Sequence, residues 1–320
     1  MFQPEVYPLC SVRLRLLICG VLLGRALANG QCGESGPTVS ITPRVRPVAT
    51  SLPRATLRLD VKLIQVPVTV TDMRDRPVMG LPKTSFRILE DNVEQQIAAF
   101  SMEDGPVSLG VVFDASLSMR NRINESRAAV EQFFQTSVPG DEYFLVRFSD
   151  RAELVTPWIQ NSDEISKELA RVRPGGWTAM IDGLRLSLME MRRASNPRRV
   201  LLVLSDGADN NSRYSEAELL SVLREGDVRV WAVGLFERPR YLQKLADETG
   251  GRVVWVHKLA ELPAAMEQLS RQIRNEYVIS YFSNHAQNDG RYHKVRIEVA
   301  PPREMKQVHA TWRQGYIAPF

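Results

Sequence analysis

The spacing of apolar residues along the chain changes close to residue 106. From residue 57 to residue 103, apolar and polar residues alternate, most strictly from Leu57 to Leu63. Such alternation is typical of strands with one buried face. It shifts by one position at Leu63-Ile64, so we expect a bulge or bend there. Residues 57–103 are therefore predicted to form an N-terminal β segment, with further extended pieces near 86–89 and 97–100.

Beyond Pro106, apolar runs alternate with stretches of helical periodicity. The predicted strands are 109–113, 143–148, 199–204, 228–233 and 252–256, and the predicted helices are 119–136, 162–172, 179–194, 215–225, 239–249 and 259–275. A run at 152–158 follows its predecessor after three residues, which is too short for a crossover, so one antiparallel edge strand is expected. Residues 107–275 are predicted to be a doubly wound α/β domain with a mostly parallel sheet.

The C-terminal segment, 276–320, returns to strand patterns at 277–282 and 295–299. Asp289-Gly290 lies between these two runs and is a signal for a hairpin turn. Neither terminal β segment is long enough to bury a core alone. We therefore expect 276–320 to pair with 57–103 in a small β module beside the α/β domain.

The first 28 residues have the pattern of a signal peptide. Arg13 and Arg15 precede an apolar run from Leu16 to Leu23, and Ala26-Leu27-Ala28 fits a cleavage site. The alternative is an N-terminal membrane anchor, but the run is much shorter than the ~20 residues of a spanning helix. We expect export to the periplasm or beyond and no membrane span in the mature chain. Residues 29–56 are rich in Pro, Ser and Thr and are predicted to be a linker.

Removal of this segment changes the charge and the cysteine content. The formal net charge of +4 falls to +2 when the three arginines and one glutamate of residues 1–28 are lost. Charges are mixed along the remaining chain, without the basic stripe that nucleic-acid binding needs. Cys10 and Cys19 leave with the signal, so Cys32 can form no internal disulfide.

Five side chains that carry oxygen lie next to predicted elements: four follow the ends of two strands, and one precedes a helix. Asp114, Ser116 and Ser118 follow the first strand, Thr178 precedes the helix at 179–194, and Asp206 follows the strand at 199–204. A serine in this position is also a common helix N-cap, which is the alternative for Ser116 and Ser118. Ligands gather at the carboxyl ends of strands in open α/β sheets, so all five side chains can converge.

Two carboxylates and three hydroxyls, without histidine or thiolate, suit a hard divalent cation and disfavour zinc. Mg²⁺ is the first expectation, with Mn²⁺ and Ca²⁺ as alternatives. Waters complete the shell of such an ion, and a carboxylate from a protein partner can displace one of them.

The pattern Asp-x-Ser-x-Ser, distant Thr and distant Asp resembles the metal-ion-dependent adhesion site of von Willebrand factor A domains. The resemblance implies coordination through the hydroxyls of Ser116, Ser118 and Thr178, and by Asp114 and Asp206 directly or through water. Leu117 stands where glycine is common in the family. The order of segments, ending in Tyr277-Val278-Ile279-Ser280-Tyr281 and Arg313-Gln314-Gly315-Tyr316, is similar to exported bacterial proteins of the acidobacterial VWFA-related type.

Three neighbouring residues leave alternatives open. Asp209 is either an outer-shell acceptor or a solvated loop carboxylate, and Asp182 is either such an acceptor or a helix-face charge. Trp177 either lines the rim of the site or packs inside.

The sequence offers little for an enzyme. It contains neither a Gly-x-Ser-x-Gly nor a Gly-x₄-Gly-Lys motif, and its histidines at 257, 285, 293 and 309 all follow the candidate metal ligands. We expect a non-enzymatic protein that binds an acidic group of a partner through the metal. The alternative is a scaffold or assembly subunit with a structural metal; a hydrolase is the weakest option.

Overall fold

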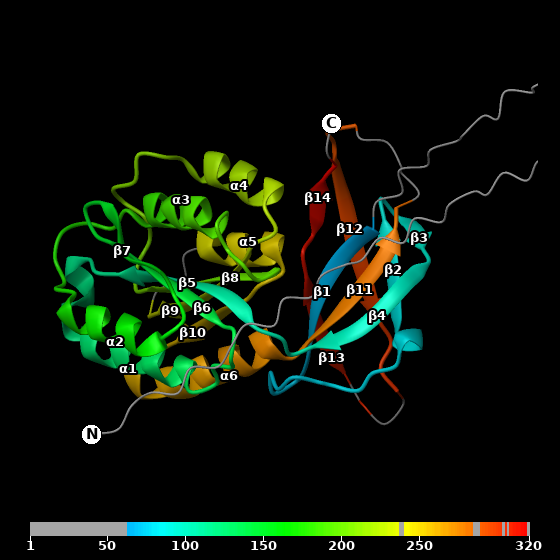
Figure 1. The fold of residues 1–320 in the computed structure, drawn as a ribbon, viewed down its shortest axis with the longest axis horizontal. Helices are drawn as coiled ribbons and strands as arrows, with labels where there is room; N and C mark the ends of the chain where they lie inside the picture. The colour runs from blue at the N-terminus through cyan, green and yellow to red at the C-terminus, as the bar shows by residue number, and fades with distance from the viewer. Residues whose placement is uncertain (1–62, 237–239, 284–288, 303–304, 306, 319–320) are drawn as a thin grey trace, which may run out of the picture. The chain divides into compact units, whose positions relative to one another are not determined.

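The computed structural model describes residues 63–236, 240–283, 289–302, 305 and 307–318 (Figure 1). The predicted signal peptide and linker lie outside the described residues. So do residues 57–62, on which the predicted bulge at the start of the first strand depends. Among the described residues, no helix is long and apolar enough to span a bilayer.

The central sheet has six strands in the order β10-β9-β8-β5-β6-β7. Its strands are β5 (Val107–Asp114), β6 (Glu142–Phe148), β7 (Ala152–Ile159), β8 (Arg198–Ser205), β9 (Arg229–Leu235) and β10 (Val253–Val256). All neighbours are parallel except β7, which pairs antiparallel with β6 at the edge. The predicted fold class, including the antiparallel edge strand, is confirmed.

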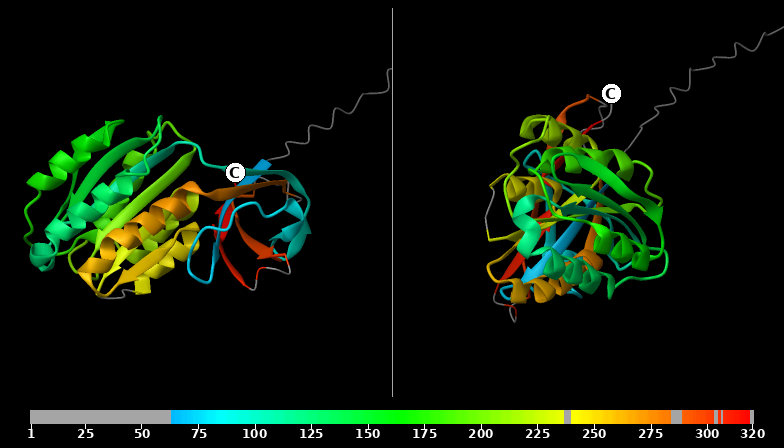
Figure 2. Two further views of the ribbon diagram at one scale, coloured as in Figure 1. Left: turned by 90° about the horizontal axis from the view of Figure 1, so that it is seen from below. Right: turned by 90° about the vertical axis from the view of Figure 1, so that its left-hand side faces the viewer.

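Helices cover both faces of this sheet, as Figures 1 and 2 show. They are α1 (Ile123–Phe134), α2 (Ser162–Arg171), α3 (Met180–Met191), α4 (Glu216–Glu225), α5 (Arg240–Thr249) and α6 (Leu262–Arg274). Apolar residues of α1, α2 and α6 share one buried cluster with the sheet, and those of α3, α4 and α5 share the other. Because both faces are covered, β5 is buried at all eight positions.

The remaining strands form two four-stranded sheets, β13-β1-β11-β4 and β14-β12-β2-β3. Their bounds are β1 (Leu63–Asp72), β2 (Phe86–Glu90), β3 (Val93–Gln95), β4 (Ile97–Glu103), β11 (Glu276–Phe282), β12 (Tyr292–Val299), β13 (Val308–Trp312) and β14 (Gly315–Ile317). Each sheet combines strands from both ends of the chain, and their inner faces share one apolar cluster. This is the β module predicted as part of the fold class.

The hairpin predicted at Asp289-Gly290 is wrong. β11 pairs with β1 and β4, whereas β12 pairs with β2 and β14 in the other sheet. Gly290 does have a positive φ of 67°, as a turn residue would. However, β11 and β12 belong to different sheets, so local turn chemistry was no guide to the pairing.

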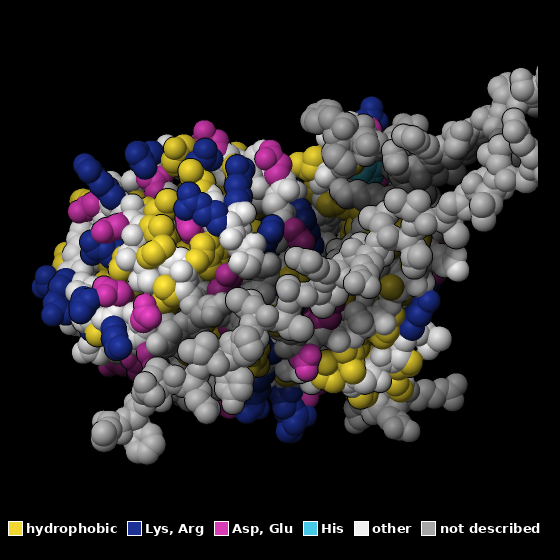
Figure 3. Space-filling model, in the orientation of Figure 1, with side chains coloured by type: hydrophobic (Ala, Val, Ile, Leu, Met, Phe, Trp, Pro, Cys, Tyr) yellow, Lys and Arg dark blue, Asp and Glu magenta, His cyan; other side chains and the backbone are white. Residues whose placement is uncertain are grey.

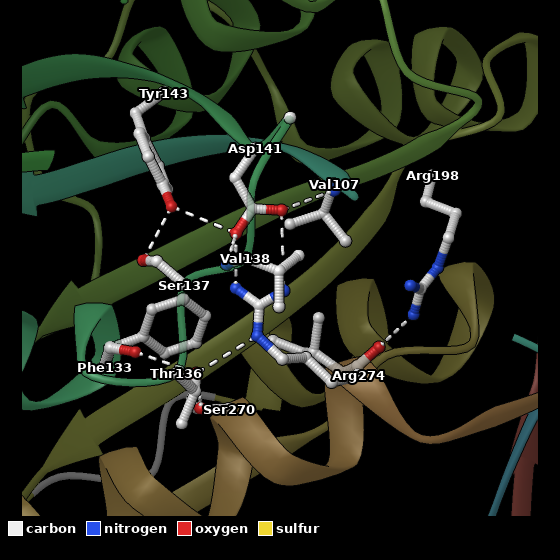
Figure 4. Close-up of polar contacts among 12 residues, drawn as sticks. Val107, Phe133, Thr136, Ser137, Val138, Asp141, Tyr143, Arg198, Ser270 and Arg274 are labelled. Carbon is white, nitrogen blue, oxygen red and sulfur yellow. Dashed lines mark hydrogen bonds and ion pairs between the residues drawn. The ribbon is translucent and has the colours of Figure 1, made fainter. Parts of the chain in front are cut away.

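A buried ion pair joins elements at the amino ends of the parallel strands (Figure 4). Asp141 accepts hydrogen bonds from the Val107 and Val138 amides at 2.8 and 2.9 Å, and from Arg274 Nη2 at 2.7 Å. Arg274 ends α6, so the contact ties this helix to the loop before β6. This polar network lies at the sheet edge opposite the strand ends that carry Asp114 and Asp206.

Candidate metal site

The strands bring together two parts of the predicted site. Asp114 is the last residue of β5, Asp206 directly follows β8, and the two strands are parallel neighbours paired as far as Phe113 and Leu204. Their carboxyl ends therefore lie side by side. A 3₁₀ helix, η2 (Leu117–Asn121), follows β5 and carries Ser118.

Hydrogen bonds link four of the five predicted ligands directly. The hydroxyls of Ser116 and Ser118 are 2.9 Å apart, and Ser118 Oγ donates to Asp206 Oδ1 at 2.7 Å. The Ser116 amide donates to Asp114 Oδ1 at 2.8 Å. Ser116 precedes η2 but makes no side-chain capping bond. The helix-cap alternative is therefore wrong for Ser116.

Thr178 is joined to this group through backbone contacts. The Leu117 amide donates to the Gly176 carbonyl at 3.0 Å, and the Gly175 amide donates to the Ala115 carbonyl at 2.9 Å. The Thr178 amide itself donates to Asn210 Oδ1 at 2.8 Å. Three loops that are distant in sequence are thus fastened to one another by backbone hydrogen bonds.

The loop after Asp206 caps the helix after Thr178. Asp209 Oδ2 accepts from the Ile181 amide at 2.9 Å, and Ser212 Oγ accepts from the Asp182 amide at 3.0 Å. These amides belong to the first turn of α3, whose N–H groups have no partner within the helix. Asp209 is therefore a capping residue, a role that neither of its sequence-based alternatives included.

Asp182 is buried, and its carboxylate accepts bonds from Arg213. Asp182 is thus a charge on the face of α3 that is buried and paired with Arg213. Together with Asp209, it fixes the loop that carries Asp206 against α3.

The two carboxylates of the site differ in their surroundings. Burial is the main cause that raises the pKa of Asp114 to about 6, opposed by hydrogen bonds from Ser116 and Ser205, and the charge of Asp206 raises it further. The Asp206 side chain is fully buried and forms an ion pair with Arg122, which directly precedes α1. Arg122 and Ser205 were not identified from the sequence.

Ser118 is exposed, whereas Asp114, Ser116, Thr178 and Asp206 are at most 5% exposed. The site therefore reaches the surface at Ser118. Around it lie apolar side chains: Trp177 is 64% exposed, Leu117 51% and Phe236 40%. The alternative that Trp177 packs inside the protein is wrong.

These residues fit a hard divalent cation. The structure collects oxygen donors of two carboxylates and two linked hydroxyls, and Thr178 lies on an adjoining, fastened loop. Arg122 pairs with Asp206, so of the two buried carboxylates it is Asp114 that would gain most from a further positive charge. Within the described ranges, no group of three or more His, Cys, Asp or Glu residues is suited to a metal. The five candidate ligands do not form such a group, because only Asp114 and Asp206 among them are of these residue types.

Gly176 offers a test of the loop that carries Thr178. Its φ is +78°, and a Cβ there would overlap the Asp150 carboxylate, whereas a Cβ at Gly175 would meet nothing within 4 Å. Asp150 also accepts the Trp177 amide at 2.8 Å. We expect Gly176→Ala to lower the free energy of unfolding by about 1–3 kcal/mol, measured by denaturant unfolding. Gly175→Ala is the control, and an equal loss in both would contradict the conformational argument.

Comparison with known proteins gives a family match for part of the chain. Residues 109–208 match the model of the von Willebrand factor type A domain. No curated protein matches the chain. The matched residues contain all five predicted ligands.

Two solved structures are similar to this chain at low identity. Proximal thread matrix protein 1 from the mussel byssus is 21% identical with a TM-score of 0.50, over 57% of this chain and 49% of its own. This chain thus spans about half of the mussel protein, one structure of which is described with a zinc-occupied MIDAS motif. A von Willebrand factor type A protein from Catenulispora acidiphila is 14% identical, with a TM-score of 0.48, over 81% of this chain and 74% of its own. The family match and the α/β fold together support a von Willebrand factor type A domain within this chain.

Proposed function

We propose that this chain is an exported, non-enzymatic binding protein that holds a divalent cation and uses it to bind an acidic group of a partner protein. The observation that carries the proposal is the linked cluster of Asp114, Ser116, Ser118 and Asp206 at the carboxyl ends of β5 and β8. A cluster of this composition belongs to the oxygen-only sites that Mg²⁺ prefers.

The roles of the side chains follow from their chemistry. Ser116, Ser118 and Thr178 would hold the cation through neutral hydroxyls, and Asp114 and Asp206 would do so directly or through water. With few negative charges among its ligands, the cation supplies a Lewis-acidic position for an external carboxylate. Mg²⁺ is the first candidate, followed by Mn²⁺ and Ca²⁺.

The surface around Ser118 adds to the description of the partner. Leu117, Trp177 and Phe236 are exposed apolar side chains beside the site. Exposed apolar and aromatic residues of this kind supply the anchors of protein interfaces. The proposed partner therefore presents a carboxylate next to apolar side chains. On the face drawn in Figure 3, acidic and basic side chains are interspersed over the α/β domain.

Binding is favoured over catalysis because no nucleophile with an adjacent base can be assembled from the sequence motifs. A scaffold with a purely structural cation is the alternative, and partner capture distinguishes the two. The proposed export is checked by N-terminal sequencing of the mature protein, which is expected to begin near Asn29.

The metal site is tested by calorimetric titration with Mg²⁺, Mn²⁺, Ca²⁺ and Zn²⁺. We expect the wild type to bind at least one of the first three ions, and Asp114→Ala to reduce binding below detection because it removes a buried ligand. Asp104→Ala is the control, since Asp104 is an exposed carboxylate before β5. Unchanged binding in Asp114→Ala would contradict the site, and binding of Zn²⁺ alone would contradict the choice of a hard ion.

In a pull-down from an envelope extract, the wild type is expected to retain partner proteins in Mg²⁺ and to release them when a chelator is added. Trp177→Ala is expected to recover less of these proteins. An exposed aromatic anchor contributes about 2 kcal/mol or more when it lies in an interface, so recovery should fall at least about tenfold. Metal affinity should remain within about twofold, because Trp177 is outside the ligand set. Recovery of the same proteins in chelator would instead support the scaffold alternative.

A further inference from the structure

Arg122 occupies a position that the proposed function leaves unexplained. Its guanidinium Nη1 donates to Asp206 Oδ2, while Ser118 Oγ donates to Oδ1 of the same carboxylate. Both oxygens of Asp206 are therefore engaged by groups of the chain itself. The Asp206 side chain is fully buried, whereas that of Arg122 is 29% exposed, so the arginine reaches the carboxylate from the surface.

The ring of Phe236 supports the other side of Arg122. The guanidinium carbon lies 4.3 Å from the ring centroid, within the range of a cation–π interaction. Phe236 has a φ of +67°, a conformation that costs energy in a residue with a side chain. The arginine is thus held between a buried carboxylate and a half-exposed aromatic ring.

The electrostatic consequence follows from Coulomb's law. Asp114 and Asp206 are two buried carboxylates, and Arg122 contacts the second of them. A divalent cation held by Asp206 would lie close to the guanidinium, and two positive charges repel strongly where burial reduces screening. Arg122 and a metal ion therefore compete for one carboxylate.

We propose that Arg122 is a tethered counter-cation that neutralises Asp206 in the metal-free site, and that it must withdraw towards Phe236 and the solvent for a divalent cation to bind. The inference rests on the proposed metal site and adds a regulatory element to it. Arg122 lowers the affinity for the ion and stabilises the loops in its absence, so the site can lose and regain metal without unfolding.

The test compares Arg122→Gln with Arg120→Gln in titrations of the mature chain with Mg²⁺ and Mn²⁺. Both variants lose one positive charge from the same short segment. However, Arg120 is exposed, and it is Arg122 that pairs with Asp206. We expect Arg122→Gln to bind the ion about tenfold more tightly and Arg120→Gln to change affinity less than about threefold, because exposed charges are screened. Metal-free Arg122→Gln should also melt at a lower temperature than Arg120→Gln and gain more from added metal.

Each outcome of these titrations decides a claim. Equal or weaker binding in Arg122→Gln than in Arg120→Gln, with normal wild-type binding, would overturn this inference and leave the metal site intact. No binding in any of the three proteins would overturn the metal site and this inference together. If Arg122→Gln does not fold without metal, Arg122→Lys replaces it. Lysine keeps the charge, but its ammonium is more strongly hydrated than a guanidinium and lacks the planar fork, so it leaves Asp206 for the solvent more easily. We therefore expect about threefold tighter binding, and wild-type or weaker affinity would contradict the competition.

Discussion

Replacing Glu276 with glutamine is expected to lower the free energy of unfolding by about 3–5 kcal/mol. Glu276 begins β11, and its fully buried carboxylate contacts Arg198 Nε at 2.7 Å and also pairs with Arg229. Both arginine side chains are only 6% exposed. Glutamine keeps the volume but removes the charge, so two buried guanidinium groups would lose their counter-ion.

The effect is measured by urea unfolding followed by tryptophan fluorescence. Glu298→Gln serves as the control because Glu298 also pairs with two arginines, Arg87 and Arg296, but its side chain is 38% exposed. Exposed pairs contribute less than about 1 kcal/mol. Similar losses in the two variants would show that the burial of Glu276 and its two arginines does not determine how much they contribute to the free energy of unfolding.

The four inner strands of the central sheet, β5, β6, β8 and β9, could be predicted because they are buried on both faces. The runs at 109–113 and 199–204 lie within β5 and β8, whose observed ends differ by one or two residues. Such strands are continuous apolar segments between helical patterns. The sequence analysis gave no order for these strands, and their order in the sheet is known from the structure.

The β module was less accessible to sequence reasoning. β3 and β14 have three residues each, and a strand this short has too few positions to show an alternating pattern. Its conformation depends on the partner strand. The pairing of β11 with β1 joins residues more than 200 positions apart, such as Val66 and Ile279, and no local signal encodes such a contact.

The candidate metal ligands could be chosen from the sequence because each follows a strand or precedes a helix, and because together they match the pattern of a known family. Arg122 gave no such signal, because an arginine at the start of an amphipathic helix is typical of a solvated surface. Its contact with Asp206 spans 84 positions. The capping of α3 by Asp209 and Ser212 was missed for the same reason: it depends on two loops meeting in space.

Asp114→Asn is expected to stabilise the metal-free protein at neutral pH while removing its metal binding. Burial raises the pKa of Asp114 to about 6 in the folded chain, with Ser116 and Ser205 donating to it and Asp206 nearby. The folded state therefore binds this proton more tightly than the unfolded state does. The free energy of unfolding is greatest below the pKa that Asp114 has in the unfolded chain, near 4, and falls as the pH rises through 6. Asparagine has no such loss.

The measurement is urea unfolding of both proteins in metal-free buffer between pH 4.5 and 7.5. Over this interval the wild type should lose about 2 kcal/mol relative to Asp114→Asn. Since asparagine offers a single acceptor oxygen to two donors, about 1 kcal/mol of the gain is offset at every pH. Asp104→Asn, at an exposed carboxylate, should show no pH-dependent difference from the wild type. A difference that does not change with pH, or one of opposite sign, would contradict this expectation. It would mean that the metal-free fold stabilises the charged form of the Asp114 carboxylate at least as well as water does, so that the ion-binding site has no cost in stability.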